Sequence, residues 1–390
     1  MKHVRVVDLT QHLSGPYCTW TLASLGAEVI KVEAIHKGDS ARETSPFVNG
    51  KSIYFESVNR CKKSLAVDLK TEAGKQILTE LLKTADVLVE NFRPGVRARL
   101  GFSDEALAAI NPRLITASIS GFGQTGSHAE YPAYDIIAQA MSGVISVNGE
   151  ENTKGVRVGF SIGDIAAGMF ATIGILHRLY ERDAAGQAPG APLDISMVGC
   201  QVALLENAYA RHLNAGDRPA PMGSRHPSIA PFESYAAADG HMVIALGSNA
   251  DWPRFCSAIG ADALTDHPQF LSTELRLEHR DALSAVLERH FATGPVDHWL
   301  ERMRLAKIAC APLMDVAGFA ASAFAQESGA FVGLTTDATR RFSKHPLAEA
   351  VPTPPAPLLG EHSRQVLINL GYEAEQINVL EAAGVVQSAA

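Results

Sequence analysis

The stretch GVRVGFSIGDIAAGMFATIGILHRLYERDAAGQAPGAPLDISM, residues 155–197, contains the features that decide the fold of this chain. Glycines and small residues lead into Asp164, where a long apolar segment typical of a buried helix begins. A carboxylate at the start of a helix has two possible uses. It caps free N–H groups of the first turn, or it acts as a nucleophile held in a pocket by the helix end. The residues on either side of this stretch favour one use over the other.

On the N-terminal side, short apolar runs alternate with helical segments. Strands are predicted at 4–9, 28–33, 64–69, 87–90 and 114–119, and helices at 15–26, 72–84 and 105–110. This order predicts βαβ units and a parallel sheet with helices on both faces. The fold class is therefore α/β, with a large, Rossmann-like, doubly wound domain over 1–197.

The pattern changes after residue 197. One helix is predicted over 198–215, within a connecting helix and loop that spans 198–224. Two short apolar runs then flank Asp239-Gly240, which predicts a β-hairpin. Helical segments follow at 252–260 and 278–291, so we expect a smaller α+β domain over 225–325.

Bulk composition excludes several classes of function. The net charge of −8 argues against nucleic acid as a partner, because phosphate binding requires a basic face. The five cysteines are scattered without metal-ligand or redox spacing, so we expect no metal and reduced thiols. The N-terminus runs directly into a strand and no uncharged apolar run reaches the length of a membrane span. We expect a cytoplasmic protein without a membrane partner.

Two short motifs suggest other enzymes. GFGQTG (121–126) matches the dinucleotide-binding fingerprint, but Pro132 delays any helix that would follow it. GFSIG (159–163) matches the nucleophile elbow of serine hydrolases, with Asp194 and His226 in the required order. No oxyanion loop of the HGGG type precedes it, so serine hydrolase remains a distant alternative.

The segment around Asp164 resembles the signature of the class III CoA-transferases, the formyl-CoA transferase and carnitine CoA-transferase group. Further blocks are similar to this family in the same order: VRVVDLTQHLSGPYCTWTLASLGAEVIKVE (4–33), NRCKKSLAVDLK (59–70), ADVLVENFRPGVRARLGF (85–102), YDIIAQAMSG (134–143) and APLLGEHSRQVLINLGY (356–372). The resemblance implies that Asp164 is the catalytic nucleophile. It also implies that about 330–390 complete the large domain and that two chains interlock as a homodimer.

The resemblance implies a set of CoA-binding residues and no prosthetic group, with the CoA thioester as substrate. The residues are Leu13, Ser14, Val67, Asp68, Leu69, Lys70, Asn91, Phe92, Arg99, Leu100, Tyr134 and Asp135. The chain also departs from some relatives, with Ala34 in place of a basic residue and no tetraglycine loop. Lys62 and Lys63 fall at one end of a predicted strand, where they either bind a CoA phosphate or belong to a solvated surface.

The expected activity is transfer of CoA from a donor resembling succinyl-CoA to a small, dicarboxylic acid through an aspartyl anhydride and an aspartyl-CoA thioester. Arg225 and His226 lie in GSRHPSIAP (223–231) and are candidates to bind the distal carboxylate of the acid. Two alternatives remain: an α-methylacyl-CoA racemase of the same superfamily, and an acetyl-CoA or formyl-CoA:oxalate CoA-transferase. A racemase normally has a histidine where this chain has Tyr134, and a phenol is a poor base near neutral pH.

Overall fold

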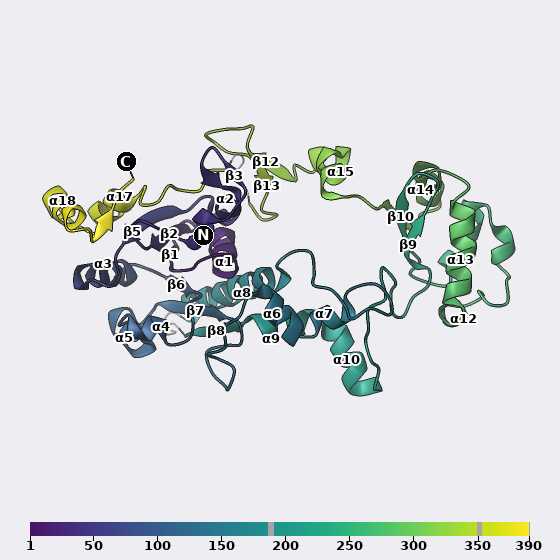
Figure 1. Ribbon diagram of the computed structural model, residues 1–390, viewed down its shortest axis with the longest axis horizontal. Helices are drawn as coiled ribbons and strands as arrows, with labels where there is room; N and C mark the ends of the chain where they lie inside the picture. Colours follow the sequence, from purple (N-terminus) through teal and green to yellow (C-terminus); the bar gives the residue numbers. More distant parts are fainter. Residues whose placement is uncertain (186–190, 349–352, 390) are drawn as a thin grey trace. The chain divides into compact units, whose positions relative to one another are not determined.

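The computed structural model describes residues 1–185, 191–348 and 353–389, which form two compact units (Figure 1). Unit 1 comprises Met1–Ile145, Arg157–Arg218 and Gly329–Ala390, and unit 2 comprises Ser146–Val156 and Pro219–Ser328. The short segment Ser146–Val156 therefore groups with unit 2, a feature that the sequence analysis did not anticipate.

Unit 1 is built on a sheet that has seven strands within the described residues, in the order β14-β5-β2-β1-β6-β7-β8. The strands are β1 (Arg5–Asp8), β2 (Glu28–Glu33), β5 (Lys63–Val67), β6 (Val87–Glu90), β7 (Ile115–Ser120), β8 (Leu193–Ser196) and β14 (Val386–Gln387). All neighbouring pairs are parallel except β14 with β5. The predicted α/β fold is confirmed, with an antiparallel strand from the C-terminal tail at one edge.

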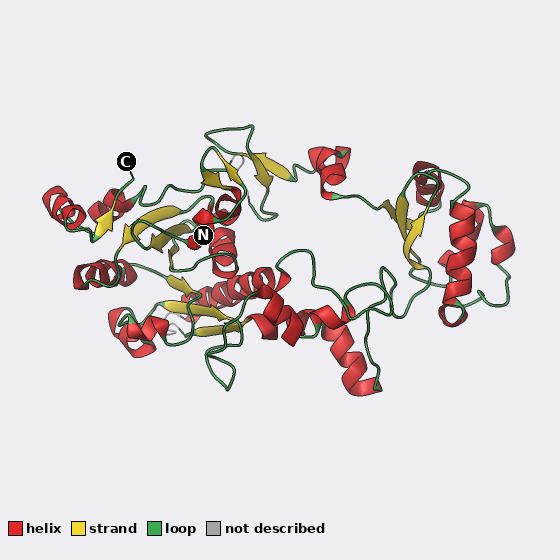
Figure 2. Cartoon of the chain, in the orientation of Figure 1, coloured by secondary structure: helices red, strands yellow, loops and turns green. Residues whose placement is uncertain are grey.

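Helices cover both faces of this sheet (Figure 2). On one face, α1 (Ser14–Ser24) and α8 (Ile162–Ala185) share a core with Val6 of β1. On the other face, α3 (Glu72–Lys83) shares a core with Val7, together with α5 (Asp104–Ile110), α17 (Ser363–Asn369) and α18 (Ala374–Ala382). Adjacent residues of one strand thus point into opposite cores, as the alternation of side chains in a strand requires.

The remaining described elements of unit 1 are short. They are η1 (Ser40–Glu43), β3 (Phe47–Val48), β4 (Lys51–Ser52), α2 (Ile53–Asn59), α4 (Val96–Arg99), α6 (Asp135–Met141), α9 (Met197–Leu204), α10 (Glu206–Ala215), β12 (Phe331–Gly333) and β13 (Arg341–Ser343). α7 (Val144–Val147) lies where the chain passes from one unit to the other.

The local sequence explains why α3 begins and which face it buries. The Thr71 side chain accepts a hydrogen bond from the Gly74 N–H at 3.0 Å and so caps the first turn. Apolar residues then recur at helical spacing, and Ile77, Leu81 and Leu82 are fully buried against the sheet.

Helices α1 and α8 pack closely at Gly168. A Cβ atom at this position would lie 2.7 Å from the carbonyl oxygen of Ser14 and 3.2 Å from the amide nitrogen of Cys18. Only glycine therefore permits the two backbones to approach this far. This contact fixes the start of α1, which carries Ser14, relative to the first turn of α8, which carries Asp164.

The segment Ile162–Ala184 of α8 is long and apolar enough to cross a membrane, with a mean hydropathy of 1.3. Ala167, Ala171 and Ile175 on one face are nevertheless fully buried in the core of unit 1. The core of a globular unit accounts for this helix.

Unit 2 contains a three-stranded antiparallel sheet within the described residues, in the order β11-β10-β9. Its strands are β9 (Phe232–Ala236), β10 (His241–Ala245) and β11 (Ala309–Pro312), and its helices are α11 (Asp251–Ile259), η2 (Asp262–Leu264), α12 (Thr273–Glu278), α13 (Arg280–Phe291), α14 (Val296–Leu305), α15 (Val316–Ala321) and α16 (Ala323–Glu327). The hairpin predicted around Asp239-Gly240 is confirmed, since β9 and β10 pair through Ala236 and His241. Trp252, Phe255 and Phe291 are buried in its core.

The single helix predicted over 198–215 is wrong. The chain forms α9 and α10, separated at Leu205. The Leu205 N–H is shared between the carbonyls of Gln201 and Val202, at 3.1 and 3.2 Å, which tightens and ends the first helix. Leucine favours helices, so its side chain gave no sign of this break.

We expect Gly168→Ala to lower the free energy of unfolding by about 1–3 kcal/mol, because the added methyl group forces α1 and α8 apart. Urea denaturation measures this loss. Gly159→Ala is the matched control, since no atom lies within 4 Å of its added Cβ. Equal stability of the two variants would contradict the close packing at Gly168.

Candidate active site

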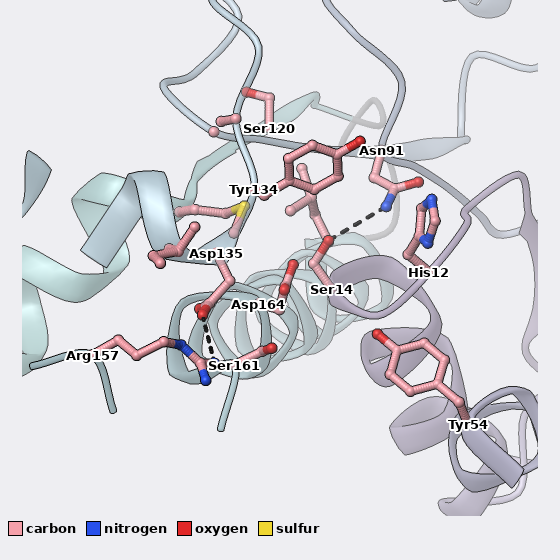
Figure 3. A pocket seen from close by; sticks show the side chains of 15 residues that line it. His12, Ser14, Tyr54, Asn91, Ser120, Tyr134, Asp135, Arg157, Ser161 and Asp164 are labelled. Carbon is pink, nitrogen blue, oxygen red and sulfur yellow. Dashed lines mark hydrogen bonds and ion pairs between the residues drawn. The ribbon is translucent and has the colours of Figure 1, made fainter. Parts of the chain in front are cut away.

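A cavity of about 460 Å³ lies in unit 1 at the carboxyl ends of β1, β6 and β7 (Figure 3). The chain proceeds from β1 to β2 on one side, and β6 lies on the other side of β1. This is a topological switch point, where ligands bind in open α/β sheets. Its polar lining consists of His12, Ser14, Tyr54, Asn91, Ser120, Tyr134, Asp135, Arg157, Ser161 and Asp164. We call this cavity the aspartate pocket.

Asp164 lies in the first turn of α8, and its carboxylate faces the pocket. Burial, and then the charge of Asp135, raise the pKa of Asp164 from 3.8 to about 7, although a hydrogen bond with Ser14 lowers it. The pocket therefore disfavours a negative charge on Asp164. A carboxylate of raised basicity in a cavity is a candidate nucleophile.

Asp135 fixes the backbone in front of α8. One carboxylate oxygen accepts the Gly163 N–H at 2.8 Å, and the other accepts the Gln139 amide at 2.6 Å. The side-chain amide oxygen (Oε1) of Gln139 in turn accepts the Val158 N–H at 2.9 Å. A Cβ at position 163 would lie 3.0 Å from the Asp135 carboxylate, so glycine leaves room for this cap. The cap of α8 is thus Asp135, which frees Asp164 for other chemistry.

Ser14 connects Asp164 to the end of β6. The Asn91 amide donates to the Ser14 hydroxyl at 3.4 Å and to the Gln11 carbonyl at 2.8 Å. Asn91 also accepts the Gln11 N–H at 2.9 Å. These contacts orient the hydroxyl that forms a hydrogen bond with Asp164.

A buried charge pair lies beneath the turn between β1 and α1. The Lys62 ammonium lies 3.0 Å from the Asp8 carboxylate and donates to the Pro16 carbonyl at 3.1 Å. Burial would raise the pKa of Asp8, but the charges of Lys31 and Lys62 hold it well below its usual range. Burial lowers the pKa of Lys62 to about 8 against the raising effect of Asp8.

A second buried pair adjoins the first. The Lys31 ammonium lies 2.9 Å from the Asp39 carboxylate and donates to the Thr10 carbonyl at 2.7 Å. The other oxygen of Asp39 accepts the His12 N–H at 3.0 Å. His12 has a φ of 63°, a strained conformation for a residue with a side chain. The pair holds it there and so directs its ring into the aspartate pocket.

A second cavity of about 530 Å³ lies at the carboxyl ends of β1, β2 and β5. Six residues predicted to bind CoA line it: Val67, Asp68, Leu69, Lys70, Phe92 and Leu100. Ala34 lines it as well, and so do His36 and Lys37, which the sequence analysis missed. Residues Thr10 and Gln11 line this cavity, whereas His12 lines the aspartate pocket, so one turn borders both cavities.

The other residues predicted to bind CoA divide into two groups. Ser14, Asn91, Tyr134 and Asp135 line the aspartate pocket. Leu13 precedes α1 and Arg99 is exposed at the end of α4, and neither lines one of the two cavities. Their role in binding CoA stays a prediction.

Lys62 has neither of the positions considered for it, whereas Lys63 is partly exposed in an ion pair at the surface. Lys62 is fully buried in its pair with Asp8, and Lys63 is bound to Glu28 at 2.6 Å. Both lie at the start of β5, the end of the strand away from the second cavity. Sequence position placed them at a strand end but did not distinguish the two ends.

Comparison with known proteins agrees with this geometry. The model of the family described as CoA-transferase family III matches residues 1–363. The chain belongs to CoA-transferase family III. It is 44% identical to an acetyl-CoA:oxalate CoA-transferase of Acetobacter aceti, over 80% of each chain. It is 35% identical to a mouse succinyl-CoA:glutarate CoA-transferase, over 99% of this chain and 90% of the relative.

A solved structure extends the likeness to the fold. The crystal structure of a CAIB/BAIF family protein from Brucella suis superposes with a TM-score of 0.83 at 31% identity, covering 94% of this chain and 98% of that one. The recognition made from the sequence is therefore confirmed, as is the assignment to the CoA-transferases.

The two predicted substrate residues lie in unit 2 of this CoA-transferase. The Arg225 guanidinium is bound to Glu151 at 3.2 Å, Glu233 at 3.1 Å and Asp281 at 3.0 Å. The backbone N–H of His226 donates to the backbone carbonyl of Phe232 at 3.1 Å. Within unit 2 these contacts serve to hold the segment in place, and a substrate role for either residue stays a prediction.

The sequence analysis missed several residues that line the aspartate pocket of this family member. Tyr54, His12 and Arg157 are among them. Burial, followed by the charge of Asp164, raises the pKa of Tyr54 to about 12, so the phenol is a neutral donor at physiological pH. Arg157 stands within the stretch that resembles the family signature, seven residues before Asp164, and this proximity was the available signal.

The raised pKa of Asp164 predicts how the free energy of unfolding changes with pH. Because folding raises this pKa from 3.8 to about 7, the folded chain binds the proton more tightly than the unfolded chain. The resulting loss of stability begins near pH 4, grows as the pH rises to about 7 and is constant above. Asp164→Asn removes it, so we expect this variant to be more stable than wild type by about 1–3 kcal/mol at pH 8.

Urea denaturation of both proteins at several pH values measures this difference, which should decrease toward zero near pH 4. A difference that does not change with pH would contradict the raised pKa.

Proposed function

We propose that this chain transfers CoA between an acyl-CoA donor and a carboxylic acid through covalent intermediates on Asp164. The observation that carries the proposal is the Asp164 carboxylate of raised pKa, which faces the aspartate pocket at the switch point of the sheet. A second cavity, lined by six of the residues predicted to bind CoA, supports it. The CoA nucleotide would occupy the second cavity and the thioester the aspartate pocket. Lys37 and Lys70 line the second cavity and supply cations for its phosphates.

The first half of the reaction moves CoA onto the enzyme. An Asp164 oxygen attacks the thioester carbonyl, the C–S bond breaks, and an acyl-aspartyl anhydride and CoA thiolate form. The thiolate attacks the aspartyl carbonyl and the donor acid leaves as its carboxylate. The product is an aspartyl-CoA thioester.

The second half repeats these steps in reverse with the acceptor acid. Its carboxylate attacks the aspartyl-CoA carbonyl and expels the thiolate, which then attacks the acyl group of the acceptor and regenerates the Asp164 carboxylate. Each step exchanges one C–S bond for one C–O bond or the reverse, and no net proton is consumed.

The electrostatics of the aspartate pocket favour this chemistry. The burial and the Asp135 charge that raise the pKa of Asp164 disfavour its carboxylate but not its neutral acyl derivatives. Acylation therefore relieves the repulsion between the two side chains. The phenol of Tyr54 lines the same pocket and is a candidate donor to the developing oxyanion.

The substrates we propose are a donor of the succinyl-CoA type and a small dicarboxylic acid. The relatives described above are named for oxalate and glutarate, both of them dicarboxylic. The mouse relative is named for succinyl-CoA and the Acetobacter relative for acetyl-CoA, so these two donors are the first to assay. Tyr134 lies in the pocket at the position where a racemase normally has a histidine, and a phenol is a poor base near neutral pH, so we favour transfer over racemisation.

We also propose a homodimer, supported by the outer face of α8. Large apolar side chains are exposed on it at helical spacing: Met169, Ile173, Leu176 and Tyr180. A helix that is buried on one face and apolar on the other requires a second partner to cover it. A second copy of the chain is the occupant that the family resemblance implies.

We expect wild-type protein to sediment as a dimer at micromolar concentration. Ile173→Glu should shift it toward the monomer, because the charge cannot be buried in an apolar interface. Thr79→Glu, on the half-exposed side of α3, is the control. A wild-type monomer would contradict the proposed dimer.

Asp164→Ala should abolish CoA transfer, with activity reduced by at least about 10³-fold, because the covalent acceptor is lost. Incubation of wild type with succinyl-CoA or acetyl-CoA, followed by hydroxylamine, should modify Asp164, and mass spectrometry of peptides locates the modification. Isothermal titration with CoA controls for binding, which the variant should retain. Full turnover by Asp164→Ala would reject the mechanism.

A further inference from the structure

Arg157 is a cation of the aspartate pocket that the mechanism above does not use. Its guanidinium lines the cavity, and its side chain is 43% exposed. In Figure 3 it reaches toward the Asp135 carboxylate, whereas Tyr54 and His12 stand on the other side of Asp164. Arg157 therefore borders the pocket on the side of Asp164 opposite Tyr54 and His12.

The contact between Arg157 and Asp135 is long. Nη2 of Arg157 lies 3.7 Å from Oδ2 of Asp135, beyond hydrogen-bond distance. Both oxygens of Asp135 already accept shorter hydrogen bonds, from Gly163 at 2.8 Å and from Gln139 at 2.6 Å. Asp135 thus neutralises part of the charge of Arg157 without occupying its N–H groups.

The N–H groups of the Arg157 guanidinium are available to bind a substrate. Within the described residues, Asp135 is the charged group paired with it, and no hydrogen bond from its five N–H donors is formed. Arg225 differs, because three carboxylates surround its guanidinium. The imidazole of His12, the other candidate cation of the pocket, is bound to the Ser40 hydroxyl at 2.9 Å. Arg157 is therefore the pocket cation best able to accept a new anion.

The pocket also requires such a cation if the substrate carries two carboxylates. Asp135 and Asp164 already place negative charge in it, and burial raises the cost of adding more. The reacting carboxylate of the acid loses its charge when it joins Asp164, but the distal carboxylate keeps its charge throughout. A planar guanidinium binds a carboxylate through two parallel hydrogen bonds.

We propose that Arg157 binds the distal carboxylate of the dicarboxylic acid and so determines the preference for dicarboxylic over monocarboxylic substrates. This inference rests on the proposed function. Because donor and acceptor acids occupy the same pocket in turn, Arg157 acts on both halves of the reaction. Its side chain positions the substrate and takes no part in bond making.

The contact between Arg157 and the distal carboxylate can be tested by exchange of a labelled acid into its own CoA thioester. In this assay the donor and acceptor acids are the same, so the chemistry is identical in both directions. Succinate with succinyl-CoA tests the dicarboxylic case. Butyrate with butyryl-CoA has the same number of carbons without the distal charge, and succinamate replaces the distal carboxylate with a neutral amide. The acceptor KM and kcat are measured for each acid.

Arg157→Gln should lower kcat/KM for succinate by about 10- to 100-fold, mainly through KM, and change the values for butyrate and succinamate less than about threefold. Arg157→Lys should restore part of the loss, because it keeps the charge without the paired donors. Arg113→Gln, an exposed arginine outside both cavities, is the matched control and should behave as wild type.

Several outcomes would overturn the inference. One is an equal loss for charged and neutral acids in Arg157→Gln, which would mean that Arg157 only supports Asp135. A second is a selective loss for succinate in Arg225→Gln but not in Arg157→Gln. A third is a wild type that prefers butyrate to succinate. Hydroxylamine trapping at Asp164 in Arg157→Gln separates these results from a failure of the proposed function, which would abolish trapping in wild type as well.

Discussion

The geometry of the candidate active site depends on two buried ion pairs, Asp8 with Lys62 and Lys31 with Asp39. Charges taken out of water are costly unless each is paired and hydrogen-bonded, and removal of one partner leaves the other uncompensated. Here the spare donors and acceptors are used by the backbone of the turn after β1, through the Thr10 and Pro16 carbonyls and the His12 N–H. The charges therefore hold a loop in one conformation.

This loop borders both cavities and fixes the positions of the other residues of the site. It begins α1, whose close contact with α8 at Gly168 sets the position of Ser14 against Asp164. The Asp135 cap then holds the first turn of α8 from the opposite side. These contacts hold Asp164, a carboxylate of raised pKa, in place, so the mechanism proposed for it would need little reorganisation when charge leaves the side chain.

Much of this arrangement could be predicted from the sequence because it depends on local patterns. Apolar runs of strand length and helical spacing gave the parallel sheet, and the block around Asp164 gave the family. The predictions that were wrong concerned features that depend on contacts the local sequence pattern does not show. Lys62 was expected to bind a CoA phosphate or to lie on a solvated surface, because nothing near it in the sequence reveals Asp8, which lies 54 residues earlier. The break at Leu205 arises from shared backbone hydrogen bonds that no side chain encodes.

The antiparallel strand β14 has a consequence for the order in which the chain is made. Val386 and Gln387 complete the sheet beside β5. The Val385 carbonyl accepts the N–H of Asp68, a residue that lines the second cavity, at 2.8 Å. Ser64 and Gly360 are joined in the same region by a hydrogen bond of 2.9 Å. During translation, the edge of β5 thus stays open until Val386 and Gln387 have been synthesised. Unit 2 is synthesised between β5 and β14. It has its own core and can fold before unit 1 is complete.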